Sequence, residues 1–158
     1  MRKLFIFAAL WLFCFTLRAD FFGTVVDVHD GDTITVKLDF ENALRKVRLY
    51  GIDAPELKQA HGEVSRDMLV SMIFQKPVVV KENGTDHYGR IIGIVTYQGV
   101  DIGGTMVLNG YAWCYRDYDK EKLYWLIEDE AKRGHRGLWG AGTPVAPWVF
   151  RKEQKGKS

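Results

Sequence analysis

The stretch Arg48-Leu49-Tyr50-Gly51-Ile52-Asp53-Ala54-Pro55-Glu56 holds one arginine and two carboxylates around a turn. Arg48 lies among alternating apolar and polar residues, a pattern that predicts a β-strand. Gly51 and Pro55 interrupt this strand, because proline fixes its own φ and favours an extended residue before it. The stretch therefore places side chains of both signs at one strand end, although a surface loop with a local ion pair would have the same composition.

The residues before this stretch predict two further strands that form a hairpin. Residues 21–29 and 33–38 are rich in β-branched and aromatic side chains, and Asp30-Gly31-Asp32 between them is a tight-turn signal. A polar turn follows, and the third strand is expected over residues 44–52.

The residues after it predict alternating helices and strands. Apolar residues spaced three to four apart predict a helix that begins near Gly62. Strands are expected over residues 77–81 and 90–97, and two more helices over residues 101–109 and 120–133.

This order of elements predicts a mainly β protein with packed helices, of the α+β class. A five-stranded OB-fold barrel with about three helices fits it best. The length of 158 residues suits one domain, which we expect over residues 20–151. The chain around Pro144 and Pro147 is expected to be a coil laid against the domain, and residues 152–158 a polar basic tail.

Residues 1–19 have the plan of a secretory signal peptide. A basic start precedes an uncharged run over residues 4–17, and the small Ala19 follows. An uncleaved N-terminal anchor is the alternative, since the charged Arg18 suits a cleavage site poorly. Removal of this segment lowers the formal net charge from +2 to −1, so anion binding has to come from local placement of cations. We expect an exported protein, either periplasmic or secreted.

Three charged clusters follow predicted strand ends. They lie at residues 29–33, 48–56 and 86–90. Each cluster alone is a common kind of turn. In a small barrel, however, loops at the same end converge, so the three clusters can form one site.

The side chains of these clusters suit phosphoryl chemistry. Asp32, Asp53 and Glu56 are hard oxygen donors, which suit Ca²⁺ or, less obviously, Mg²⁺. Arg48 and Arg90 are forked donors that fit phosphate oxygens and stabilise the charge that develops on them. A carboxylate that does not bind the ion can orient or deprotonate an attacking water.

In this order, the three motifs resemble the staphylococcal nuclease family. The resemblance covers residues 21–151 and rests on DGDT at residues 30–33, RLYGIDAPE at residues 48–56 and DHYGR at residues 86–90. GLW at residues 137–139 also resembles bacterial members. The resemblance implies an OB-like barrel with three helices.

The activity implied by the resemblance is Ca²⁺-dependent hydrolysis of DNA and RNA, without preference for the sugar, to 3′-phosphate ends. Its Ca²⁺ ligands would be Asp32, Asp53 and the backbone carbonyl of Ala54. No obligate protein partner is expected, and the nucleic acid is expected to be single-stranded or frayed.

The resemblance also implies roles for the other motif residues. Glu56 would activate or position the attacking water, and Arg48 and Arg90 would grip the phosphate in the transition state. Tyr88 would contact a neighbouring phosphate.

Two substrate contacts depart from the family pattern or stay open. His87 stands where some members have lysine, and a neutral imidazole grips phosphate less well than an ammonium group. An aromatic residue after Cys114 should stack on a base, and either Tyr115 or Tyr118 fits, with Arg116 as another candidate.

Two other functions remain as alternatives. The same barrel can serve as a catalytically silent module that binds nucleic acid or protein, but such modules usually lose the carboxylates or the arginines. A phosphodiesterase for small nucleotides is the other alternative.

Overall fold

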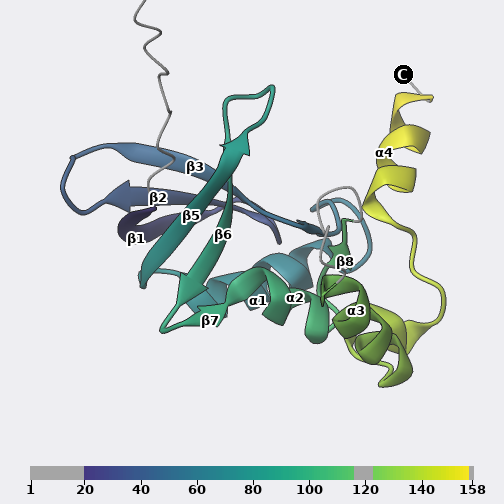
Figure 1. The fold of residues 1–158 in the computed structure, drawn as a ribbon. Coiled ribbons are helices and arrows are strands. Elements are labelled where there is room, and N and C mark those ends of the chain that lie inside the picture. The colour runs from purple at the N-terminus through teal and green to yellow at the C-terminus, as the bar shows by residue number, and fades with distance from the viewer. Residues whose placement is uncertain (1–19, 116–122, 157–158) are drawn as a thin grey trace, which may run out of the picture.

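The structure is a computed structural model that describes residues 20–115 and 123–156. The expected signal peptide, Arg116 and Tyr118 lie outside these residues. Five strands form a closed barrel in the order β3-β2-β1-β5-β6, and β3 pairs with β6 in parallel to close it. This arrangement confirms the predicted five-stranded OB-fold (Figure 1). The barrel strands are β1 (Phe21–Val28), β2 (Thr33–Leu38), β3 (Leu44–Leu49), β5 (Pro77–Thr85) and β6 (Ile91–Tyr97).

The barrel forms because side chains along each strand alternate between its interior and solvent. Ile34 and Val36 of β2 and Val47 and Leu49 of β3 are buried in the core. Irregular pairings between Val25 and Asp27 in β1, and between Glu82 and Gly84 in β5, interrupt the ladders where the strands bend around the core.

The expected third strand is divided into two. β3 ends at Leu49, and Gly51 with φ of 77° turns the chain into β4 (Ile52–Asp53). A side chain at Gly51 would come within 2.9 Å of the Tyr124 ring, so glycine is needed for both conformation and space. β4 pairs with β8 (Trp113–Cys114), while β7 (Val100–Asp101) pairs with β6.

Three of the four α-helices in the described residues were expected. They lie on the lower side of the barrel in Figure 1. Leu69 and Ile73 of the first helix are buried in the barrel core, and Asp101 caps the second helix by accepting a hydrogen bond from Gly104 N at 3.2 Å. The three are α1 (Gly62–Ile73), α2 (Ile102–Leu108) and α3 (Leu123–Arg133).

The prediction of a coil at the C-terminal end of the domain is wrong. A 3₁₀ helix, η1 (Gly137–Ala141), follows α3, and the fourth α-helix, α4 (Pro147–Lys155), follows that. Pro147 occupies the start of α4, where its missing N–H costs no helical hydrogen bond. The first residues of the expected basic tail, up to Lys155, therefore continue a helix that stands beyond β8 (yellow in Figure 1).

Residues 20–115 and 123–156 include no helix that is both long and apolar enough to cross a membrane.

Candidate active site

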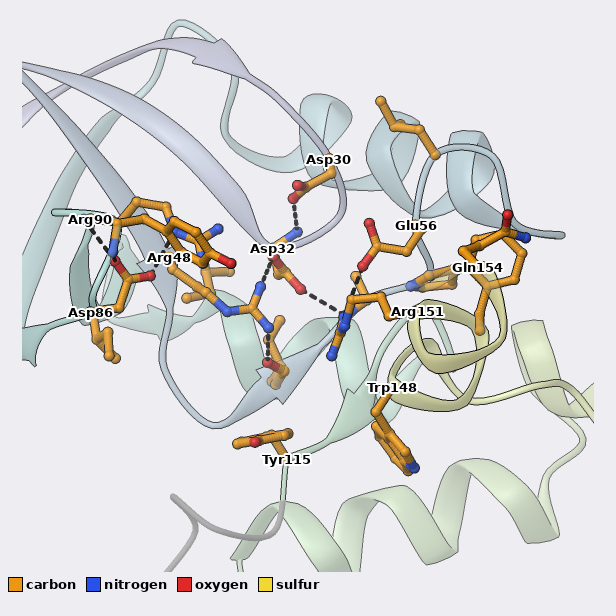
Figure 2. A pocket seen from close by; sticks show the side chains of 18 of the residues that line it. Asp30, Asp32, Arg48, Glu56, Asp86, Arg90, Tyr115, Trp148, Arg151 and Gln154 are labelled. Atoms are coloured by element: carbon orange, nitrogen blue, oxygen red, sulfur yellow. Dashed lines mark hydrogen bonds and ion pairs between the residues drawn. The ribbon is translucent and has the colours of Figure 1, made fainter. Parts of the chain in front are cut away.

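The three charged clusters meet at one cleft, as expected. It has a volume of about 1030 Å³. The β1–β2 turn, the β3–β4 segment and the β5–β6 loop all contribute to its wall (Figure 2). Its charged lining includes Asp32, Arg48, Glu56, Asp86 and Arg90.

Arg48 joins the first two clusters. Strand register places it opposite Thr33, so its side chain lies beside Asp32 at the start of β2. Its guanidinium donates from Nη1 to Asp32 Oδ1 and from Nη2 to Asp53 Oδ1, the second at 2.8 Å. Burial lowers the pKa of Arg48, but Asp32 and Asp53 outweigh this and raise it above its ordinary value. Arg48 therefore stays charged between two buried carboxylates.

The carboxylate of Asp32 is held from several sides. Thr33 Oγ1 donates to Oδ1 at 3.0 Å, and Ala54 N donates to Oδ2 at 2.8 Å. Asp30 Oδ1 accepts a hydrogen bond from Asp32 N at 3.0 Å. Burial and then the charge of Asp32 raise the pKa of Asp30 to about 7. Asp30 thus helps to fix the turn that carries Asp32.

Arg90 is fixed by its own loop. Its Nε donates to Asp86 Oδ2 at 2.7 Å, and Asp86 Oδ1 accepts from the backbone of Tyr88 and Arg90. Burial opposes the charged form of Asp86, but the hydrogen bonds from Arg90 prevail and lower the pKa of Asp86. Arg90 Nη1 also lies 3.4 Å from Thr33 Oγ1, which links the third cluster to the first.

Aromatic side chains lie around the same cleft. Tyr88 is 74% exposed, its ring centre lies 3.8 Å from that of His87, and the Arg90 guanidinium lies 5.4 Å from it. Tyr115 also lines the cleft and is held by a hydrogen bond from its backbone N to Gly51 O at 2.8 Å. The expected site residues that the structure describes thus line this cleft, except for Asp53, which is buried behind it and bound to Arg48; Tyr118 lies outside the described residues.

Sequence reasoning missed Arg151, which contacts two of the expected site residues. It extends from α4 toward Glu56 (Figure 2). Its Nη1 donates to Glu56 Oε1 at 2.8 Å and to Asp53 Oδ1 at 3.1 Å, and its Nη2 donates to Asp53 Oδ2 at 2.8 Å. The hydrogen bond to Asp53 is the main cause that raises the pKa of Arg151. The one sequence signal was Pro147, which can begin a helix as well as end one.

Asp53 lies between the two arginines and is fully buried. Burial raises the pKa of Asp53, while Arg151 and Arg48 act in the opposite direction. Both of its oxygens accept hydrogen bonds from guanidinium groups. The carboxylate therefore has its charge compensated by the protein itself.

The expected Ca²⁺ ligands lie together but bind arginines. The hydrogen bond of Ala54 N to Asp32 and the bridge of Arg48 to Asp53 bring the three residues to one place. Each carboxylate oxygen can accept more than one partner. The donor atoms are all oxygens, which are the ligands that a hard cation such as Ca²⁺ prefers. Within residues 20–115 and 123–156, no three His, Cys, Asp or Glu side chains form a group arranged for a metal ion.

Comparisons with known proteins agree on one family. The model of the family described as "Staphylococcal nuclease homologue" matches residues 46–141. An "Uncharacterized endonuclease" of Escherichia coli is 42% identical over 155 residues, which cover 96% of this chain and 98% of the relative. A "Micrococcal nuclease" of Shigella flexneri is 39% identical over 87% of this chain and 84% of its own. A "Probable staphylococcal-like nuclease CAN3" of Oryza sativa subsp. japonica is 40% identical over 70% of this chain and 29% of its own.

Proposed function

Because the chain belongs to the staphylococcal nuclease family and is a hydrolase of the nuclease class, we propose that it cleaves DNA and RNA phosphodiesters without preference for the sugar. The reaction depends on Ca²⁺ and leaves 3′-phosphate ends. The observation that carries this proposal is the meeting of Arg48, Arg90, Asp32 and Glu56 in one open cleft, with the buried Asp53 bound directly to Arg48 behind them.

Asp32, Asp53 and the backbone carbonyl of Ala54 would hold the ion. A bound Ca²⁺ supplies positive charge that polarises the phosphate. In its absence Arg48 and Arg151 neutralise Asp53, so ion binding has to compete with Arg151 for this carboxylate. Arg48, which bridges the two aspartates, keeps them at one place.

The remaining charged residues act on the phosphodiester. Glu56, released from Arg151, takes a proton from water or positions it as the water oxygen adds to phosphorus. Arg48 and Arg90 stabilise the negative charge that develops on the phosphate oxygens. The bond from phosphorus to the 5′ oxygen breaks, this oxygen takes up a proton from solvent and leaves as a hydroxyl, and the phosphate remains on the 3′ side.

The aromatic groups that line the cleft favour unpaired substrate. Tyr88 and Tyr115 line the cleft and can contact a strand whose bases are unstacked, since base stacking on an aromatic ring tolerates any sequence. His87, which lies beside Tyr88 and also lines the cleft, adds a hydrogen-bond donor for phosphate. No obligate protein partner enters this proposal.

We propose further that the protein is exported, as periplasmic or secreted. The support is the basic start and the uncharged run of residues 4–17. The N-terminal sequence of the protein recovered from the periplasm or the medium tests this. A chain that begins after Ala19 supports export with cleavage, and an intact N-terminus in the membrane fraction supports an anchor.

The test of the reaction is cleavage of single-stranded DNA and RNA by the purified protein, with Ca²⁺ and with EDTA. We expect Ca²⁺-dependent degradation of both, with 3′-phosphate groups on the products. Binding of DNA without cleavage under either condition would favour a silent binding module. Cleavage of mononucleotide diesters but not of polymers would favour a small-nucleotide phosphodiesterase.

A further inference from the structure

One side of α4 faces the active-site cleft with cations. Arg151, Lys152 and Lys155 all line the cleft; Lys155 follows Arg151 by four residues and Lys152 by three, spacings that bring side chains to the same side of a helix. The acidic residue of α4, Glu153, does not line it. The cleft side of the helix thus has three positive charges and no negative one, in a protein whose remaining charge is nearly balanced.

The position of α4 across the cleft is fixed at two points. Just before the helix, Val145 O accepts a hydrogen bond from Gln59 Nε2, and Gln59 N in turn donates to Glu56 O at 2.8 Å. One turn into the helix, Arg151 binds Asp53 and Glu56. The helix is therefore attached to the same loop that carries the expected general base.

The two lysines of this side are available to a ligand. Both are exposed, and the ion pairs found among the described residues include neither Lys152 nor Lys155. Arg151 and Lys155 are four residues apart, so about 6 Å of helix axis separates them. Lys155 can therefore reach a phosphate beyond the one that lies at the arginines.

On the basis of the proposed function, we infer that α4 forms the second wall of the substrate groove. Lys152 and Lys155 bind backbone phosphates of the single strand that neighbour the phosphate at the cleaved bond. α4 lies beyond the residues matched by the family model, which end at Ala141. The wall adds affinity for polymers and is independent of base sequence, because its contacts are to phosphate alone.

Equilibrium binding in EDTA tests this without any cleavage. The probe is a fluorescently labelled oligothymidylate, and its anisotropy is followed over a range of NaCl concentrations for the parent, for Lys152→Gln with Lys155→Gln, and for a control. The control pair is Lys37→Gln with Lys81→Gln, two exposed lysines of the barrel strands that do not line the cleft. All three proteins have their fold checked by circular dichroism.

Each lost phosphate contact on a single strand lowers the slope of log K against log[salt] by about 0.7. We therefore expect the α4 pair to lower the slope by about 1.4, and the control pair to leave it unchanged. An equal slope for the α4 pair and the parent would overturn the inference, as would an equal fall for both pairs.

The result is separable from that of the proposed function. A protein that shows the slope change but never cleaves DNA would support the α4 wall and contradict the nuclease reaction. If the parent cleaves DNA with Ca²⁺ but the α4 pair leaves the salt slope unchanged, the nuclease reaction is supported and the α4 wall is contradicted. With an active protein, the α4 pair should also lower kcat/KM on the oligonucleotide more than on a dinucleotide.

Discussion

At the scale of the residue, Arg48 decides how the candidate site is held together. It contacts Asp32 and Asp53, two buried carboxylates that come from different strands. Leaving either carboxylate without its cation inside the protein would be costly. The same guanidinium thus compensates both carboxylates in the metal-free fold and lines the cleft.

Glu56→Gln tests the proposed base. Glutamine can still accept the hydrogen bond of Arg151, but it cannot take a proton from water. We expect kcat to fall by about 10² to 10⁴, with little change in the affinity for DNA measured in EDTA. Glu63→Gln, an exposed carboxylate that does not line the cleft, should keep the parent kcat. Turnover by Glu56→Gln at the parent rate would remove Glu56 from the mechanism.

Asp86→Asn tests how the loop holds Arg90. The pKa of Asp86 is lowered by folding, so its charge stabilises the fold above the unfolded pKa of about 3.9 and this contribution is lost as pH falls through the folded value. The parent should exceed the variant in unfolding free energy at about pH 6, and the difference should shrink at about pH 3. Urea unfolding in EDTA measures the unfolding free energies of the parent and the variant at each pH. A difference that is the same at both pH values would contradict the ion pair.

At the scale of the element, the loop of Glu56 is packed against the start of α1. A Cβ on Gly62 would lie 2.0 Å from Glu56 O and 2.8 Å from Leu57 Cα. The turn is closed by the hydrogen bond from Gly62 N to Gln59 O at 3.0 Å. The first residue of α1 therefore sets the position of the expected base.

Gly62→Ala should displace this loop. We expect a loss of about 1–3 kcal/mol in unfolding free energy, as for other overpacked sites, and a lower kcat at temperatures where the variant is folded. Gly156→Ala is the matched control, because the nearest atoms to a Cβ there are at 3.8 Å. Thermal unfolding and steady-state kinetics give both values. If Gly62→Ala keeps the stability and kcat of the parent, the loop can move away from the added methyl group without cost, and Gly62 does not set the position of Glu56.

The strands could be predicted from the sequence, and the last helix could not. The alternation in residues 33–38 gave the bounds of β2 directly, because β-branched residues bounded by turns rarely fit another structure. α4 is a nine-residue polar helix, too short to be stable alone. The hydrogen bond of Gln59 to Val145, just before α4, and the ion pair of Arg151 with Asp53 hold the helix in place, and no local sequence pattern indicates either contact.

At the scale of the whole molecule, Arg151 joins the C-terminal helix to the barrel across nearly a hundred residues of chain. Five charged members of the site could be found from motifs, because their loops follow barrel strands in order. Arg151 could not, since it belongs to no such motif and its contacts to Asp53 and Glu56 arise only when the chain is folded. The partners of a long-range ion pair are so far apart in the sequence that no motif or periodic spacing connects them.

Arg151→Gln should make the fold depend more strongly on Ca²⁺. In EDTA the buried Asp53 loses charged hydrogen bonds, so unfolding free energy should fall by about 1–3 kcal/mol. With Arg151 absent, the ion no longer competes for Asp53, so added Ca²⁺ should raise the melting temperature more than in the parent. Calorimetric titration should show tighter Ca²⁺ binding.

The control is Arg45→Gln, which removes an exposed ion pair with Glu41 at 3.7 Å. It should change neither the unfolding free energy in EDTA nor the rise in melting temperature on adding Ca²⁺. If Ca²⁺ stabilises Arg151→Gln no more than the parent, Arg151 and the ion do not compete.

The parallel pairing of β3 with β6 has a consequence for how the chain acquires its activity. Arg48 lies opposite Ile92, and Arg90 directly precedes the paired residues. This pairing joins segments more than forty residues apart, and non-local contacts of this kind form late because chain entropy opposes them. The two arginines that we propose to bind the phosphate therefore come into register only as the barrel closes. A partly folded chain thus carries the charged residues of a nuclease without the arrangement that the site requires.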